Sequence, residues 1–100
     1  MEDFLVTDYE NLDKKAEILK AMAHPIRLCI LRGLSENDEK QVNDMKSCLN
    51  MPQSTISQHV GILKKEGLIK GRRDGVNIYY SIANDDVKNL IKVVLEDIWK

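Results

Sequence analysis

The chain has 100 residues, of which 43% are hydrophobic, and a formal net charge of −1 at pH 7. These values indicate one small globular domain and exclude a disordered chain. No apolar run reaches the roughly 18 residues of a membrane span, and the acidic start MEDF lacks the layout of a signal peptide. We therefore expect a cytoplasmic protein with no membrane association.

The small net charge conceals an uneven distribution. Residues 1–50 hold 10 acidic and 7 basic side chains, whereas residues 51–83 hold five basic and two acidic ones, a net charge of +3. A basic segment within an acidic chain is typical of a surface that binds a polyanion, because its charge sets the orientation of approach.

The first elements are expected to be a flexible arm over residues 1–8 and an amphipathic helix over residues 9–23. Leu12, Ala16 and Leu19 recur on one face of that helix. Its N-terminal part extends beyond what a small core needs, so we expect this face to contact a partner subunit. A second helix over residues 25–35 starts with Pro25 in its first turn. It is apolar nearly all round and should be central in the fold.

The next two helices form a helix-turn-helix unit. Asp38 is a good N-cap residue for a third helix over residues 39–48, and residues 50–52 form a tight turn before a fourth helix over residues 53–66. In such a unit the second helix enters the major groove of DNA.

The fourth helix has two contrasting faces. Ile56, Val60 and Leu63 fall in one narrow sector, which predicts a buried stripe. The opposite face is centred on Ser54 and Gln58 and has no carboxylate before the helix ends. Hydroxyl and amide groups can bond to base edges, whereas an ordinary surface helix would carry more charged residues. We interpret this helix as a recognition helix.

A basic β-hairpin is expected directly afterwards, over residues 68–82. Asp74 and Gly75 form a strong turn signal between two extended runs, and Lys70, Arg72 and Arg73 lie at or near the tip. A recognition helix followed by a basic hairpin is a winged helix-turn-helix arrangement.

The last helix is expected over residues 84–99, capped by Asn84. It carries a wide apolar stripe at a point where little core is left to cover. The predicted fold is therefore mainly α with a small β-hairpin: five helices, a two-stranded wing, and a homodimer formed through the first and last helices. The predicted dimer interface comprises Leu12, Leu19, Leu90, Ile91, Val94 and Ile98.

Three motifs resemble those of the ArsR family of winged-helix repressors. They are LKAMAHPIRL at residues 19–28, LNMPQSTISQHV at 49–60, and KKEGLI with RDGVNIYY at 64–69 and 73–80. The resemblance covers residues 9–99. It implies a homodimer that binds double-stranded DNA at a palindromic operator, represses a promoter, and is commonly released by metal or thiol chemistry.

The resemblance also implies roles for individual residues. Lys64 would contact phosphate, and Arg72 and Arg73 would place the wing on phosphate or in a minor groove. His59 lies nearer the buried stripe than Gln58, so packing or phosphate contact remains as open as base readout. The residues implied to face DNA from the recognition helix are Gln53, Ser54, Thr55, Ser57, Gln58 and His59.

The sequence departs from the family at its known sensor sites. Gln41 and Asn43 stand where metal-sensing members have cysteines at the third helix, so thiolate ligation is lost there. The positions of the zinc ligands between last helices align loosely with Asn84, Asp86, Asp97 and Lys100, without any imidazole. We expect no metal site and no cofactor, and any inducer would be an unknown small molecule or protein.

Cys29 and Cys48 leave one alternative open. Both lie on apolar faces, where free cysteine usually acts as a small hydrophobe. Related thiol sensors pair a cysteine of the second helix with one in the last helix, which has none here. A repressor that responds to thiol oxidation through Cys29 or Cys48 remains the alternative regulation.

Two other function classes fit the sequence less well. A winged-helix protein-interaction module without DNA binding would keep the fold but would not need the basic wing. An enzyme is not expected, because His24 and His59 are the only histidines and no catalytic set, phosphate loop or metal cluster is evident.

Overall fold

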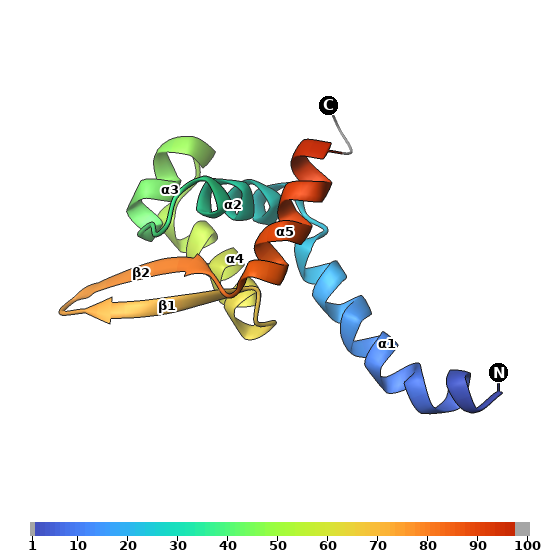
Figure 1. The fold of residues 1–100 in the computed structure, drawn as a ribbon. Helices are drawn as coiled ribbons and strands as arrows, with labels where there is room; N and C mark the ends of the chain where they lie inside the picture. The colour runs from blue at the N-terminus through green and yellow to red at the C-terminus, as the bar shows by residue number, and fades with distance from the viewer. Residues whose placement is uncertain (1, 98–100) are drawn as a thin grey trace.

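The computed structural model describes residues 2–97, with side chains placed for residues 8–46 and 50–95. Figure 1 shows helix α1 projecting from one side of the molecule and the β-hairpin projecting from another. The prediction of five helices and a two-stranded wing is confirmed. The elements are α1 (Glu2–Met22), α2 (Pro25–Glu36), α3 (Val42–Leu49), α4 (Gln53–Lys65), β1 (Ile69–Asp74), β2 (Asn77–Ile82), α5 (Asp85–Lys92) and a π-helical turn, η1 (Val93–Asp97).

Helix α2 is the centre of the core, as its all-round apolar sequence predicts. It packs against α3, α4, α5 and β2. Leu31 and Leu34 of α2 are fully buried together with Ile56 and Leu63 of α4. The helix begins at Pro25, and the ring of His24 caps it by accepting a hydrogen bond from the backbone N–H of Ile26 at 3.1 Å. This core holds α4 in a fixed position.

Helix α1 is longer than predicted, because it begins at Glu2 where the sequence suggested a flexible arm over residues 1–8. The apolar spacing of Leu12 and Leu19 extends back to Tyr9 on the same face of the helix. At 1.5 Å per residue its 21 residues span about 31 Å. Tyr9, Leu12 and Leu19 are 68%, 49% and 55% exposed in the single chain.

Helix α3 begins at Val42, three residues later than predicted, and its N-cap is Gln41 instead of Asp38. The cause is a backbone pairing that the sequence analysis did not anticipate. Lys40 forms an antiparallel bridge with Tyr80 of β2, in which its N–H donates to the Tyr80 carbonyl at 2.9 Å and its carbonyl accepts at 2.8 Å. This bridge keeps the segment before α3 extended.

The hairpin turn is shifted by one residue from the predicted position. Asp74 pairs with Asn77, so Gly75 and Val76 form a two-residue loop. Gly75 has a φ of 65°, which suits the first position of a type II′ turn. Val76 at the tip is 95% exposed instead of lying within a strand.

Helix α5 begins where predicted, since the side chain of Asn84 accepts a hydrogen bond from the N–H of Val87 at 2.9 Å. Its apolar stripe is divided between two environments. Ile91, predicted at the dimer interface, is 1% exposed within the single chain, because the core of its own subunit covers it, and this leaves it little surface for contact with a partner. Leu90 and Val93 are 37% and 45% exposed. Ile98 lies outside the described residues.

Candidate DNA-binding surface

Helix α4 shows the two faces that its sequence predicts. Ile56, Val60 and Leu63 are at most 2% exposed, packed into the core. The side chains on the outer face are exposed to solvent except Thr55, which is half-buried. The exposed residues of this face are Gln53, Ser54, Ser57, Gln58, Gly61, Lys64 and Lys65. The first turn of α4 has no acidic residue, and its last turn carries the two lysines. This polar surface is free of negative charge and could approach phosphate and base edges.

A short turn fixes the angle between α3 and α4. Asn50 adopts the left-handed conformation, with a φ of 51°, and its N–H donates to the carbonyl of Lys46 at 3.0 Å. Pro52 then opens α4 by accepting hydrogen bonds from Thr55 and Ile56. Asparagine tolerates this backbone region better than most residues, so the local sequence accounts for the tight turn.

His59 points away from the outer face of α4. Its Nδ1 lies 3.1 Å from a terminal guanidinium nitrogen of Arg27, and its ring centroid lies 4.6 Å from that of His24. Arg27 also donates from Nε to the carbonyl of Ala21 at the end of α1. Burial, followed by the charges of His24 and Arg27, lowers the pKa of His59 below its ordinary value. Through Arg27 and His24, His59 therefore links α4 to α2 and to the end of α1. This environment favours a packing role for His59 over phosphate contact or base readout.

The two arginines of the hairpin occupy different faces. In the strand register Arg72 lies opposite Tyr79 and Arg73 opposite Ile78. Since alternate residues point to opposite sides of a hairpin, Arg73 shares the side of Ile78, which borders a groove shared with α3 and α4. Arg73 is exposed, and it lies on the side of the hairpin nearer to α4.

Arg72 is held by a residue that the sequence analysis did not identify. Its Nε and a terminal nitrogen each donate to a carboxylate oxygen of Glu39 at 2.9 Å. Its guanidinium also lies 4.8 Å from the ring centroid of Tyr79. The hydrogen bonds from Arg72, more than any other influence, lower the pKa of Glu39. The pair with Glu39 neutralises Arg72 and leaves only the remaining guanidinium N–H groups free for a contact with DNA.

A groove of about 320 Å³ separates the recognition helix from the hairpin. Gln53 and Ser57 line it from α4, while Asn77 and Ile78 line it from β2. The groove brings together residues of α4 and β2 that are at least 20 positions apart and that can all form hydrogen bonds or apolar contacts with one ligand. Its walls are the helix and the hairpin that sequence analysis assigned to DNA.

Two of the positions that align with the metal ligands of other family members serve as helix caps here. Gln41 caps α3, where its N–H donates to the Asp44 carboxylate at 3.1 Å, and Asn84 caps α5. Among the residues that the structure describes, no group of three His, Cys, Asp or Glu side chains could hold a metal ion. Cys29 is a half-buried free thiol on α2, and the side chain of Cys48 lies outside the described part. No described helix is long and apolar enough to cross a membrane.

Comparisons with known proteins agree with this architecture. Residues 24–70 match the model of the family described as "Bacterial regulatory protein, arsR family". The chain is 46% identical over 87 residues to an HTH-type transcriptional regulator of Methanocaldococcus jannaschii, covering 87% of this chain and 98% of the relative. It is 40% identical to the transcriptional repressor PagR of Bacillus anthracis, covering 87% of each chain.

A solved structure supports the fold as well. The homodimeric winged helix-turn-helix DNA-binding domain Mb0332 of Mycobacterium bovis superposes with a TM-score of 0.80 and 36% identity, covering 86% of this chain and 79% of that domain. The chain is therefore a member of the ArsR family, a winged helix-turn-helix transcriptional regulator.

Proposed function

We propose that the protein acts as a homodimeric repressor that binds a palindromic operator, with α4 in the major groove and the hairpin on the flanking backbone. The observation that carries this proposal is the outer face of α4, which is exposed, rich in hydrogen-bonding groups and free of carboxylates. Basic side chains flank it at Lys64 and at Arg73 of the hairpin. The rest of the chain has a net negative charge, which orients this face toward DNA.

Each exposed polar group then has a distinct role. Gln58 lies near the middle of the outer face, and its amide suits bidentate bonding to adenine. Ser54 and Ser57 suit shorter contacts to bases or phosphate. Lys64 and Arg73 neutralise phosphate without reading sequence. Gln53 sits at the start of α4, where backbone N–H groups also favour an anion. Thr55, half-buried, contributes less to the contact.

A homodimer explains two apolar surfaces that the single chain leaves exposed. Leu12 and Leu19 lie along α1, and Leu90 and Val93 lie on the outer side of the last helix. Val94, half-buried, borders the second of these surfaces. A two-fold axis through α1 and α5 would bury both surfaces at once and present two recognition helices to successive major grooves.

The likeness to PagR, a transcriptional repressor 40% identical to this chain, supports repression as the proposed effect on the promoter. The test is a reporter gene placed behind the promoter that the protein binds. Expression should rise when the protein is deleted and fall again when it is restored. A fall in expression on deletion would identify an activator instead. A variant that cannot bind DNA should fail to restore the original expression, and a variant that still restores it would show that the effect on the promoter is indirect.

A further inference from the structure

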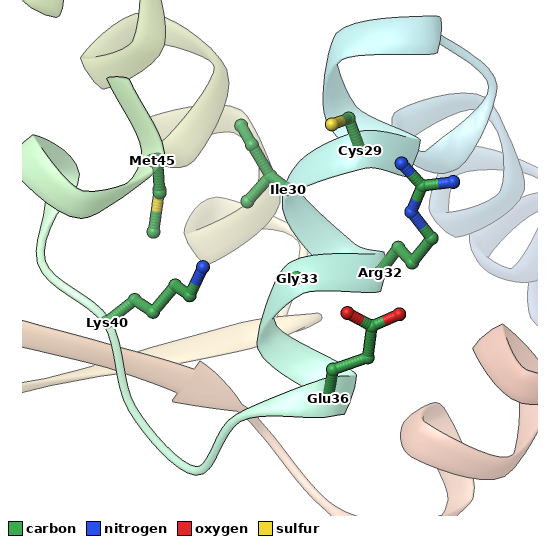
Figure 2. Close-up of a pocket in the computed structure, with 7 residues that line it drawn as sticks. All are labelled: Cys29, Ile30, Arg32, Gly33, Glu36, Lys40 and Met45. Carbon is green, nitrogen blue, oxygen red and sulfur yellow. The ribbon is translucent and has the colours of Figure 1, made fainter. Parts of the chain in front are cut away.

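A small pocket lies between α2 and the segment that leads into α3 (Figure 2). Its volume is about 100 Å³. Ile30 and Met45, which are 3% and 4% exposed, form its inner wall, and Cys29 lies beside them on α2. A cavity of about 150 Å³ can hold benzene, so this pocket, which is open at its mouth, suits a ligand of about four to six non-hydrogen atoms.

The ammonium group of Lys40 lies at one end of the pocket and has no protein partner among the described side chains. The ammonium of Lys40 lies over Gly33, 3.8 Å from where a β-carbon on that residue would stand. Lys40 is half-buried, and among the described side chains its nitrogen has neither an ion pair nor a hydrogen bond. Arg32 stands on the rim as a second cation, with Glu36 as the one acidic group lining the pocket.

Lys40 also connects the pocket to the wing. Its backbone forms the bridge to Tyr80 of β2, at 2.9 and 2.8 Å. The residue before it, Glu39, holds Arg72 of β1 through two hydrogen bonds. One short segment therefore carries a side chain into the pocket and contacts both strands of the hairpin. A ligand that fixes the Lys40 ammonium would act on the position of the wing.

We propose that this pocket binds a small organic monocarboxylate with a short alkyl body, and that binding changes affinity for DNA through the bridge between Lys40 and Tyr80. The carboxylate would pair with the ammonium of Lys40, and the alkyl part would contact Ile30 and Met45. That apolar wall favours such a molecule over phosphate or sulfate, which have no apolar part. The regulatory half of this proposal rests on the DNA-binding function proposed above, whereas the binding half does not.

The binding half is tested on the full-length protein without DNA, using butyrate as the probe. Amide signals of Gly33 and Met45 are followed by NMR during titration at neutral pH. Butyramide has the same shape but no charge, so it should bind roughly ten- to a hundredfold more weakly. Butyrate should saturate with a Kd of about 1 mM or below. Absence of any shift at these residues, or equal binding of butyramide, would overturn the proposal.

Two lysine variants separate the pocket from general charge effects. Lys40→Met should lose butyrate binding while keeping the backbone bridge, and Lys46→Met, an exposed change on α3, should leave it unaltered. A dispersed amide spectrum confirms that each variant is folded. Butyrate binding that survives in Lys40→Met would contradict the assigned role of the ammonium.

The coupling is then measured as the affinity for duplex DNA with and without saturating butyrate. Butyrate should change that affinity about fivefold or more in the wild type and leave it unchanged in Lys40→Met. A wild-type affinity that stays the same would refute the coupling while the binding result stands. Butyrate binding in a protein that binds no DNA at all would sustain the pocket and refute the proposed function.

Discussion

The two neighbouring arginines of the wing should behave differently toward DNA. Arg73 is exposed on the side of the hairpin nearer to α4, whereas Arg72 is bound to Glu39 by two hydrogen bonds of 2.9 Å. Because the Glu39 carboxylate already neutralises Arg72, this pair brings no net positive charge to a phosphate and should release few counterions from DNA. We therefore expect Arg73 to supply the wing contact.

The size of the effect follows from counterion release. Each phosphate neutralised contributes about −0.9 to the slope of log Kobs against log salt concentration. In a dimer, Arg73→Ala removes two contacts, so the slope should become shallower by about 1.8. When salt rises from 50 to 200 mM, the affinity of each protein falls by some factor. That factor should be about twelve times larger for the wild type than for the variant.

The assay is fluorescence anisotropy on a random-sequence duplex, because phosphate contacts are independent of sequence. The matched control is the double change Glu39→Ala with Arg72→Ala, which removes the ion pair without changing net charge. Its salt slope should stay at the wild-type value. The reasoning is refuted if Arg73→Ala retains the wild-type slope or if the double variant loses as much slope as Arg73→Ala does.

Three further predictions concern the helices. Gln58→Ala should weaken binding to the selected operator by roughly 1–3 kcal/mol and leave binding to random DNA nearly unchanged. Equal losses of affinity for operator and for random DNA, measured in paired titrations, would rule out base readout by Gln58. Leu90→Glu should dissociate the dimer in sedimentation, because an unpaired charge would be buried in the interface. The control Asn89→Glu, at an exposed position, should stay dimeric. If Leu90→Glu also stays dimeric, Leu90 does not lie in the interface. The lowered pKa of His59 means that the folded state favours its neutral form. The free energy of unfolding should therefore decrease as pH falls through the unfolded value of about 6.5, and His59→Gln should lack this part of the decrease in denaturant titrations; identical pH dependence in both proteins would contradict it.

Local sequence patterns predicted the parts of the structure that local chemistry controls. The buried stripe through Ile56 and Val60 follows from helical spacing, and the cap at Asn84 from a side chain that bonds three residues ahead. The outer face of α4 could be predicted for the same reason. Each of these features depends on residues within about one or two helical turns.

Local sequence patterns could not predict the contacts between segments that are distant in the sequence. The pair of Glu39 with Arg72 joins residues 33 positions apart, and the bridge from Lys40 to Tyr80 joins residues 40 apart. Neither leaves a periodic trace, and the bridge delays the start of α3 although residues 39–41 could be helical. The apolar stripe of α5 gave no indication that Ile91 faces the core of its own subunit, because periodicity does not identify the surface that covers it.

The most direct test of the proposed function is a binding titration of the purified protein against a library of genomic DNA fragments at near-physiological salt, followed by footprinting of the retained fragments. We predict selective retention of a small set of fragments, with protected half-sites related by inverted symmetry and about one helical turn apart. Retention of fragments without sequence preference, or no retention at all, would contradict a sequence-specific regulator and support a winged-helix interaction module.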